Sequence, residues 1–303
     1  MTAQPLLAVD APSLYFRAFH GIPEKAAQTA TGEPVNAIRG FLDMLAQLIR
    51  TRHPDRIVCA LDASWRPAWR VALVPSYKKH RVAHGDVEVV PPALERQIPV
   101  LLEVLRAVGI PAFGVDGYEA DDVLGTLAAT QSAPVEVVSG DRDLFQLVDD
   151  GRGTRLLYCG RGVAKLEDAD DALVVAKYGV PARWYADFAA LRGDASDGLP
   201  GVPGVGEKTA ARLVSRYGDV EQILAALDDP EAGFAPGVRT KLDAARDYLA
   251  RALPVCRVAL DVKLPDFDPA MPRSPRDPEA LLALADRWNL AGSARRLVDA
   301  LAA

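Results

Sequence analysis

Three short apolar runs in this chain each lead directly into an aspartate. The runs are Leu6–Asp10, Arg56–Asp62 and, ahead of Gly140-Asp141, Val135–Ser139. Each has the length and composition of a buried β-strand, and near-continuous apolar strands are typical of parallel sheets covered on both faces. The carboxyl ends of parallel strands meet at one edge of a sheet, where α/β proteins bind their ligands. We therefore expect the three aspartates to converge at such an edge.

Helical patterns separate these runs, so strands and helices alternate along the chain. Strands are predicted at Leu6–Asp10, Arg56–Asp62, Ala112–Val115, Val135–Ser139 and Arg155–Cys159. Amphipathic helices are predicted at Pro34–Arg52, with Pro34 in the first helical position, and at Pro92–Val108, Ala120–Gln131 and Asp143–Val148. This alternation is typical of an α/β fold with a mostly parallel, twisted sheet flanked by helices.

The strand signal fades near residue 167, and short helices follow it. We therefore expect an α/β domain over residues 1–167 and a helical subdomain over residues 168–303. Irregular connections are predicted at Asp228–Gly237 and Leu264–Pro278. The last helical segment is predicted at Ala280–Leu301, with a break near Gly292.

Composition narrows the class of protein. The chain has 303 residues, half of them hydrophobic, and contains neither an eighteen-residue apolar stretch nor an N-terminal secretion pattern. Its three cysteines, Cys59, Cys159 and Cys256, lie far apart without metal-type spacing. Cys59 and Cys159 lie in apolar runs, which predicts buried free thiols of a reduced compartment. We expect a cytoplasmic protein without a membrane partner, and a monomer by default.

Nine carboxylates fall in five clusters, namely Asp10, Asp62, Glu119/Asp121/Asp122, Asp141/Asp143 and Asp194/Asp197. Gathered in one crevice they would repel one another unless cations neutralised them. Mg²⁺ and Mn²⁺ prefer oxygen ligands, and two such ions can promote phosphodiester hydrolysis. Structural alternatives stay open: the single aspartates can cap helices, and acids at a helix start suit its dipole. Five clusters together favour a site for two divalent metals.

A basic segment without acids runs from Ser64 to Gly85. It contains Arg66, Arg70, Lys78, Lys79 and Arg81, two histidines, and interleaved Trp65, Trp69 and Tyr77. Such a segment can follow phosphates while its rings stack on bases, although a solvated helix face is the plainer alternative. The net charge of −6 does not oppose this, because without the nine clustered acids 35 Lys and Arg face 32 acids.

A glycine-rich loop precedes a predicted helix at Thr209–Tyr217. The loop reads Leu199-Pro-Gly-Val-Pro-Gly-Val-Gly-Glu-Lys-Thr-Ala210, too short in its spacing for a Walker A loop. Glycines let backbone amides approach a phosphate, and the helix start favours an anion. The pattern fits a helix-hairpin-helix at about 199–217 that holds a DNA backbone without reading sequence, although a simple interhelical turn stays possible.

Taken together, these motifs resemble the bacterial 5′-nucleases of the flap-endonuclease type, which occur as the N-terminal domain of DNA polymerase I and as free-standing enzymes. No polymerase sequence follows residue 303, and we expect a stand-alone member. The resemblance runs from Leu6 to the C-terminus and is most specific at Gly117-Tyr-Glu-Ala-Asp-Asp122, Gly140-Asp-Arg-Asp-Leu144, Gly193-Asp-Ala-Ser-Asp197 and the Gly201–Ala210 hairpin.

The resemblance implies a PIN-like α/β sheet with a helical subdomain, and it assigns roles to individual residues. The implied ligands of two Mg²⁺ or Mn²⁺ ions are Asp10, Asp62, Glu119 and Asp121 in one cluster and Asp141, Asp143, Asp194 and Asp197 in the other, with Asp122 between them. Lys78 and Arg70 stand where the family contacts the scissile phosphate, and Ser64–Pro92 matches its helical arch. Further DNA contacts are expected from Arg66, Tyr77, Lys79, Arg81, Gly204, Gly206, Lys208 and Thr209, with a K⁺ ion at the hairpin.

The resemblance predicts a structure-specific 5′-nuclease of replication and repair, with 5′-3′ exonuclease and 5′-flap endonuclease activity. Its substrates would be DNA with free 5′ ends, flaps or branched junctions, and RNA primers in hybrids. Alternatives are a non-catalytic junction-binding protein, a PIN-type ribonuclease and, more remotely, a small-molecule phosphatase. One departure is that Gly198 follows Ser196-Asp197 where the family usually has Asn, which puts the local order of this loop in question.

Overall fold

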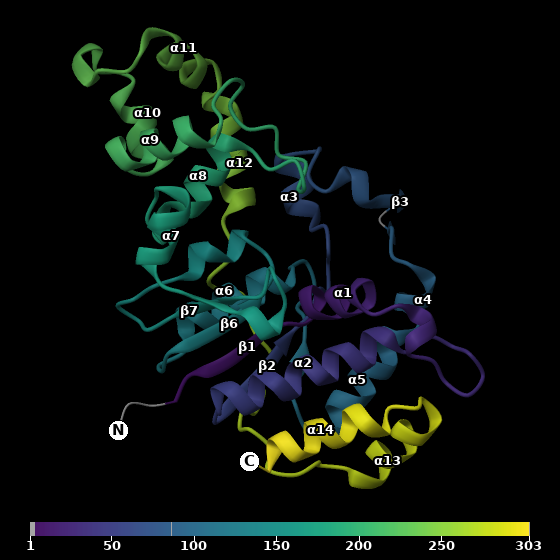
Figure 1. Ribbon diagram of the computed structural model, residues 1–303. Helices are drawn as coiled ribbons and strands as arrows, with labels where there is room; N and C mark the ends of the chain where they lie inside the picture. Colours follow the sequence, from purple (N-terminus) through teal and green to yellow (C-terminus); the bar gives the residue numbers. More distant parts are fainter. Residues whose placement is uncertain (1–3, 86, 303) are drawn as a thin grey trace.

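A six-stranded sheet forms the centre of the molecule in the computed structural model, which describes residues 4–85 and 87–302 (Figure 1). Its strands follow the order β5-β2-β1-β6-β7-β8, and all neighbours are parallel except β7 and β8. The predicted, mostly parallel α/β sheet is therefore confirmed. The strands are β1 (Leu6–Asp10), β2 (Arg56–Ala60), β5 (Ala112–Phe113), β6 (Val135–Ser139), β7 (Arg155–Tyr158) and β8 (Glu167–Ala169).

Strand β1 shows how the sheet is buried on both faces. Leu6 and Ala8 belong to one hydrophobic core, and Leu7 and Val9 belong to the other. All four side chains are fully buried, because successive residues of a strand point to opposite faces and both faces are covered. This is the physical reason for the continuous apolar runs in the sequence.

Helices cover the two faces unequally. One core contains residues of α1 (Ala11–Gly21), α2 (Asn36–Arg52), α4 (Pro92–Glu95), α5 (Gln97–Val108), α13 (Pro278–Arg287) and α14 (Ala291–Leu301). The other core runs from α6 (Ala120–Thr130) into a helical region that lies at the top in Figure 1. That region contains α7 (Asp171–Tyr178), α8 (Tyr185–Arg192), α9 (Glu207–Tyr217), α10 (Val220–Ala226), α11 (Pro236–Ala244) and α12 (Arg246–Cys256). Short 3-10 turns lie at Glu24–Ala26, Lys79–Arg81, Asp143–Leu147, Val163–Lys165, Ala182–Trp184 and Pro230–Ala232.

Several predicted boundaries were wrong for local reasons. Helix α2 begins at Asn36, because Pro34 instead forms an antiparallel bridge with Gln28. Helix α1 was not predicted; Asp10 starts it by accepting a hydrogen bond from the Ser13 N–H at 3.0 Å. Three predicted helices differ in form: the helix predicted at Pro92–Val108 is split at Arg96 into α4 and α5, Asp143–Leu147 is a 3-10 helix, and α9 begins at Glu207. The antiparallel strand β8 was not predicted, and the predicted irregular segment Asp228–Gly237 contains helical turns. The last helical segment is broken at 288–290, which leaves Gly292 inside α14.

The predicted arch segment, 64–92, contains less helix than expected. Its regular elements are α3 (Ala68–Leu73), the 3-10 turn at Lys79–Arg81, and the hairpin strands β3 (Val82–His84) and β4 (Val87–Glu88). Figure 1 shows α3 and β3 above the sheet, on the same side as the helical region. The segment is anchored at its start, where Gly117 N–H donates to Ser64 Oγ at 2.9 Å and Trp69 Nε1 donates to Gly117 O at 3.1 Å.

The last two helices lie away from the helical region to which the sequence assigned them. Helices α13 and α14 pack on α5 and α2, at the opposite end of the molecule in Figure 1. Leu297 and Leu301 insert into the core beneath α2 and are 0% and 1% exposed. The division at residue 167 stays a prediction, but the stretch from Pro278 onward is part of the α/β body because its apolar face is buried there.

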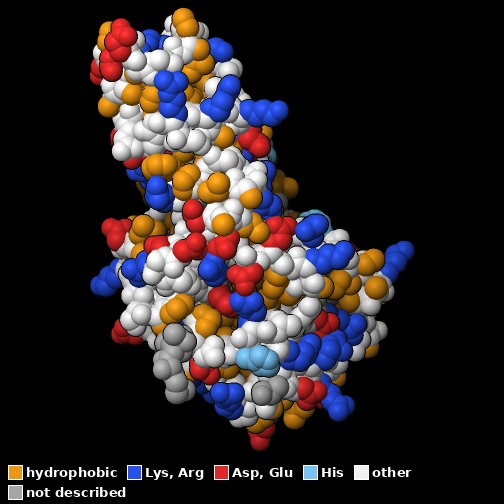
Figure 2. Space-filling view, turned by 60° about the vertical axis from the view of Figure 1, so that its left-hand side comes forward, with side chains coloured by type: hydrophobic (Ala, Val, Ile, Leu, Met, Phe, Trp, Pro, Cys, Tyr) orange, Lys and Arg blue, Asp and Glu red, His pale blue; other side chains and the backbone are white. Residues whose placement is uncertain are grey.

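All three cysteines are buried and free, which confirms the prediction made for Cys59 and Cys159. Within the described residues, no helix is long and apolar enough to cross a membrane. Charge is unevenly distributed on the surface: Figure 2 shows acidic side chains gathered across the middle of one face, with lysines and arginines beside them. The net negative charge therefore does not preclude basic surfaces elsewhere.

Truncation of Leu297 tests whether α14 is part of the central core. We expect Leu297→Ala to lower the free energy of unfolding by about 2–5 kcal/mol, because it removes a fully buried side chain. Leu282→Ala on neighbouring α13 is the control, since this side chain is 65% exposed. Urea unfolding followed by circular dichroism measures both; equal effects would show that α14 is not packed as described.

Candidate active site

The sheet changes its winding direction beside β1, and two of the predicted acids lie there. Strand β1 pairs with β2 on one side and β6 on the other, and the chain proceeds outward in both directions, which leaves a crevice at the carboxyl ends. Ser139 Oγ donates to Asp10 Oδ2 at 2.5 Å and accepts a hydrogen bond from the Asp141 N–H at 2.9 Å. Ser139 thereby links the acids that follow β1 and β6.

A pocket of about 220 Å³ opens at this crevice, and its wall is rich in carboxylates. They come from the ends of β1, β2 and β6, from the start of α6 and from the arch hairpin. Two cations, Lys78 and Arg81, share the lining. The acidic members are Asp10, Asp62, Glu88, Glu119, Asp121 and Asp141. The structure thus brings together five of the nine predicted metal ligands.

Crowding of like charges changes the proton affinity of these acids. Burial, reinforced by the charges of Asp62 and Asp141, raises the pKa of Asp10 to about 7 despite its hydrogen bonds from Ser139 and Ser13. Burial and then the charges of Asp141, Asp10 and Glu119 raise the pKa of Asp121 well above its ordinary value. A cation in the pocket would relieve both effects, since it favours the ionised carboxylates.

The donor set suits a hard divalent cation, with water completing the coordination. Within the described residues, no hydrogen-bond donor is directed at the Asp121 carboxylate, and Asp62 and Asp141 each accept one bond, from Ala120 N–H and Asp143 N–H, both at 2.8 Å. Their remaining oxygens are open to a ligand. No group of three or more acidic, histidine or cysteine side chains in the described part of the chain is arranged so that it could hold a metal ion. A cation bound in this arrangement would have to keep several waters, which Mg²⁺ tolerates.

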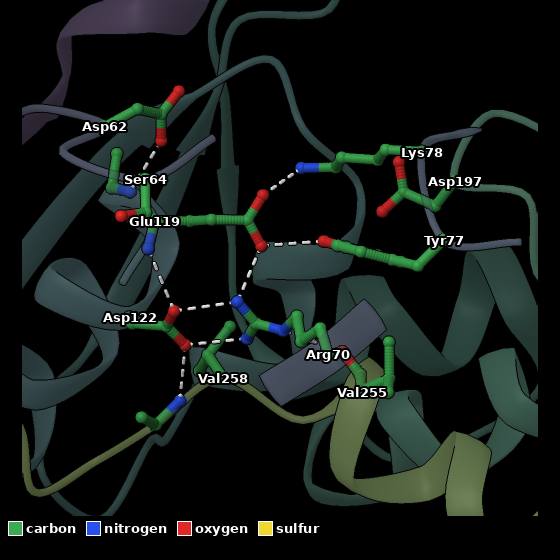
Figure 3. A network of polar contacts seen from close by, with 12 residues as sticks. Asp62, Ser64, Arg70, Tyr77, Lys78, Glu119, Asp122, Asp197, Val255 and Val258 are labelled. Carbon is green, nitrogen blue, oxygen red and sulfur yellow. Dashed lines mark hydrogen bonds and ion pairs between the residues drawn. The ribbon is translucent and has the colours of Figure 1, made fainter. Parts of the chain in front are cut away.

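Glu119 is held by three side chains from the arch, as Figure 3 shows. Its Oε2 accepts hydrogen bonds from Arg70 Nη1 and Tyr77 Oη, both at 2.6 Å, and Lys78 Nζ pairs with Oε1. Burial alone would lower the pKa of Lys78, but the charges of Glu119, Tyr77 and Asp197 hold it well above its ordinary value. Lys78 is therefore a permanent cation at the edge of the pocket.

Asp122 belongs to a buried structural network and does not line the pocket. Arg70 Nη1 and Nη2 donate to its two oxygens, both at 2.7 Å. The Glu119 and Ala259 N–H groups donate to the same carboxylate at 3.1 and 2.8 Å. The oxygens of Asp122 are occupied and the residue is 0% exposed, so in this arrangement its contacts are structural. Its expected role as a metal ligand stays a prediction.

Two predicted contacts of the arch are also placed differently. Arg70 is 2% exposed and is directed at Glu119 and Asp122, so the expected contact with a scissile phosphate is not available to it. Tyr77 is 3% exposed and faces Glu119, which removes it from the expected DNA-facing set. The physical reason is that a guanidinium and two carboxylates can be buried only when they are paired.

The second predicted metal cluster is divided: Asp141 lines the pocket, whereas Asp143, Asp194 and Asp197 lie outside its lining. Burial and then the charges of Asp141, Asp197 and Asp194 raise the pKa of Asp143 well above its ordinary value. Burial would raise the pKa of Asp194 too, but hydrogen bonds from Ser196 and the charge of Arg192 lower it. At Asp143 the charge of Arg192 offsets only part of the rise in pKa, so the surroundings of this carboxyl oppose its ionisation.

The predicted DNA-contacting residues differ in their exposure and in whether other protein groups already bind them. Arg66 donates to two arch carbonyls, Tyr77 O at 2.6 Å and Pro75 O at 3.1 Å, and Arg81 pairs with Asp197 at 3.1 Å. Lys79 is exposed. In the hairpin, Gly204, Gly206 and Lys208 are exposed and Thr209 is half-buried at the start of α9. The hairpin is therefore the more accessible of the two basic regions.

Three residues near the pocket were not identified from the sequence. Ser139 orients Asp10 and Asp141, and its place at the end of an acid-bearing strand was an available signal. Glu88 joins the lining because the arch hairpin folds over the pocket, which local sequence does not indicate. Arg17 lies under the turn at Gly140, with its buried Nε lacking a hydrogen-bond partner among the described residues.

Comparison with known proteins adds family information to this geometry. Residues 5–179 match the family model "5′-3′ exonuclease, N-terminal resolvase-like domain", and residues 180–278 match "5′-3′ exonuclease, C-terminal SAM fold". A 5′-3′ exonuclease of Streptomyces coelicolor is 53% identical over 98% of this chain and 100% of its own length. One of Mycobacterium tuberculosis is 48% identical over 98% of both chains. DNA polymerase I of Mycobacterium bovis is 37% identical over 98% of this chain and 32% of its own length.

Solved structures of low sequence identity share the fold. The T5 5′-exonuclease described with bound divalent metal ions (zinc) has a TM-score of 0.65 at 18% identity, covering 98% of this chain and 99% of that one. The catalytic core of Rad2 in complex with a DNA substrate has a TM-score of 0.63 at 16% identity, covering 98% and 93%. The arrangement of sheet and helical region is thus common to these proteins.

Removal of the Arg70 guanidinium tests its structural assignment. We expect Arg70→Met to lower the free energy of unfolding by about 3–5 kcal/mol, because it leaves the buried charge of Asp122 unpaired. Lys79→Met, at an exposed position of the same segment, should change it by less than about 0.5 kcal/mol. Urea denaturation gives both values. A small change in the free energy of unfolding for Arg70→Met would contradict the structural assignment and favour the predicted phosphate contact of Arg70.

The raised pKa of Asp10 predicts a particular pH dependence. Between the ordinary value of 3.8 and about 7 the folded protein holds a proton that the unfolded chain releases, so this group's contribution to stability declines as pH rises through that window. Asp10→Asn should therefore reduce the loss of unfolding free energy between about pH 4 and about pH 7 in EDTA.

Asp266→Asn, at an exposed position outside the pocket lining, is the control for this measurement. An unchanged pH profile in Asp10→Asn would contradict the raised pKa.

Proposed function

The chain belongs to the 5′-3′ exonuclease family, and we propose that it cleaves DNA phosphodiesters near free 5′ ends and 5′ flaps with two divalent cations bound at the acidic pocket. The observation that carries this proposal is the convergence of five predicted acids with Lys78 and Arg81 at the switch point of the sheet. The cations would be Mg²⁺ or Mn²⁺, which prefer oxygen ligands.

The residues have separate roles in this proposal. Asp10, Asp62, Asp121 and Asp141 would hold one cation, with Glu119 joining them when Lys78 moves. Asp143, with Asp194 and Asp197, would hold the other. When bound, the cations supply Lewis acidity toward the phosphodiester and activate an attacking water. Lys78, a permanent cation at the pocket edge, would donate to a phosphoryl oxygen and offset its charge.

The helical region would hold the duplex. Lys208 and the exposed backbone at Gly204 and Gly206 lie at the start of α9, where the helix dipole favours a phosphate. A K⁺ ion could bind the hairpin carbonyls, although Lys241 Nζ, which donates to Gly204 O at 3.3 Å, would have to move away from that oxygen. Such contacts position DNA without reading its sequence, and RNA primers in hybrids would be accepted on the same grounds. We further propose a monomer that acts in the cytoplasm.

A 5′-labelled flap DNA tests the nuclease proposal directly. We expect release of short labelled fragments near the junction in Mg²⁺ or Mn²⁺ and none in EDTA. Asp141→Asn should reduce kcat by at least about 100-fold, because it removes a proposed ligand of a catalytic cation. Lys78→Ala should reduce kcat by about 10- to 100-fold, because it removes a donor to the reacting phosphate.

Asp268→Asn, an acid outside the pocket, serves as the matched control and should cleave like the parent protein. Retained DNA binding without cleavage in either metal would favour the non-catalytic junction-binding alternative. Cleavage restricted to RNA would favour the ribonuclease alternative.

A further inference from the structure

The segment that carries Lys78 runs in backbone contact with the loop that carries Asp197. The Lys78 N–H donates to Asp197 O at 2.8 Å. Three residues further on, Arg81 Nη2 donates to Ser196 O at 3.0 Å and to Asp197 Oδ1 at 3.1 Å. Figure 3 shows Asp197 beside Lys78 and Tyr77. The loop that carries Asp194 and Asp197 is called the second acidic loop below. The arch and this loop are joined at one point, through main-chain as well as side-chain atoms.

Gly198 makes this contact sterically possible. A Cβ atom at this position would lie 2.2 Å from Ser76 O and 3.1 Å from Ser76 C. Both neighbours are backbone atoms, so no side-chain rotation could relieve the overlap. The φ of Gly198 is +70°, in the left-handed region that favours glycine. Two independent constraints, close approach and backbone conformation, thus require glycine here.

The contact also fixes the backbone of Lys78. Lys78 itself has a φ of 47°, which is uncommon for a residue with a side chain and persists only where the surroundings impose it. Its N–H is bound to Asp197 O while its Nζ reaches Glu119, in the other acidic cluster. One residue therefore spans both groups of acids.

We propose that Gly198 is a positioning residue, whose lack of a side chain lets the arch approach the second acidic loop so that Lys78 and Asp197 are held in fixed register at the pocket. The inference rests on the catalytic role proposed above for Lys78. It also gives a steric reason for glycine at a position where the family usually has asparagine.

Two substitutions separate the two constraints at this position. Asparagine adopts left-handed φ values at low cost, so Gly198→Asn tests the close approach with little backbone strain. Gly198→Ala adds the smallest Cβ and combines both effects. Gly179→Asn is the matched control, because its φ is +73° and its nearest neighbour, Ala211 Cβ, lies at an ordinary 3.5 Å from the added atom.

The decisive measurement is a double-mutant cycle on flap cleavage, using Gly198→Asn, Lys78→Ala and the combined variant. We expect Gly198→Asn to lower kcat by about 10- to 100-fold with KM within about twofold, since misplacement of a catalytic group affects the chemical step. In the Lys78→Ala background the same substitution should change kcat by less than about twofold, because the group that it misplaces is absent. Gly179→Asn should retain full kcat.

Amide hydrogen exchange gives a readout that is independent of catalysis. The Lys78 N–H, bound to Asp197 O, should exchange faster in Gly198→Asn than in the parent protein, and equally fast in Gly179→Asn and the parent. Full kcat in Gly198→Asn, or an equal loss with and without Lys78, would overturn this inference while Lys78→Ala remained impaired. Full kcat in Lys78→Ala would instead contradict the proposed catalytic role of Lys78 itself.

Discussion

A buried guanidinium joins the three parts of this molecule. Arg70, on α3 of the arch, forms ion pairs with Glu119 and Asp122 at the start of α6. It also donates to Val255 O and Arg257 O at the end of α12, both at 3.3 Å. A buried ion pair adds little to folding stability compared with an apolar contact, but a buried charge left without its partner lowers the stability by several kcal/mol. Arch, sheet and helical region must therefore adopt their positions together, and the acidic pocket is lined by residues of the arch and the α/β body.

This arrangement sorts the acids by how their charge is balanced. Asp122 is neutralised by Arg70, and Asp194 is stabilised by Ser196 and Arg192, so neither requires an external cation. Asp10, Asp121 and Asp143 have raised pKa values because burial and neighbouring carboxylates oppose their ionisation. Protein groups thus balance the negative charge of some of these carboxylates, and the negative charge that they do not balance faces the crevice. A divalent cation is the ligand that this unbalanced negative charge favours.

Features governed by local pattern were predictable from the sequence. The buried strands β1 and β6 were predicted to the residue, because apolar runs bounded by polar residues have few other solutions. The convergence of Asp10, Asp62 and Asp141 followed from parallel topology alone. Features that depend on distant contacts were not predictable. The burial of Arg70 depends on residues 49 and 52 positions away, and α14 depends on α2, some 250 residues earlier. The need for glycine at position 198 depends on the Ser76 carbonyl, which no local pattern indicates.

Binding of Mn²⁺ to the metal-free protein tests most directly whether the carboxylates at the switch point form a cation site. Free Mn²⁺ gives an electron paramagnetic resonance signal that is lost on binding, so a titration reports affinity without requiring cleavage. The account predicts saturable binding that Asp141→Asn weakens and Asp268→Asn leaves unchanged, because Asp141 lines the pocket and Asp268 does not. Equal binding by the parent protein and Asp141→Asn would contradict it.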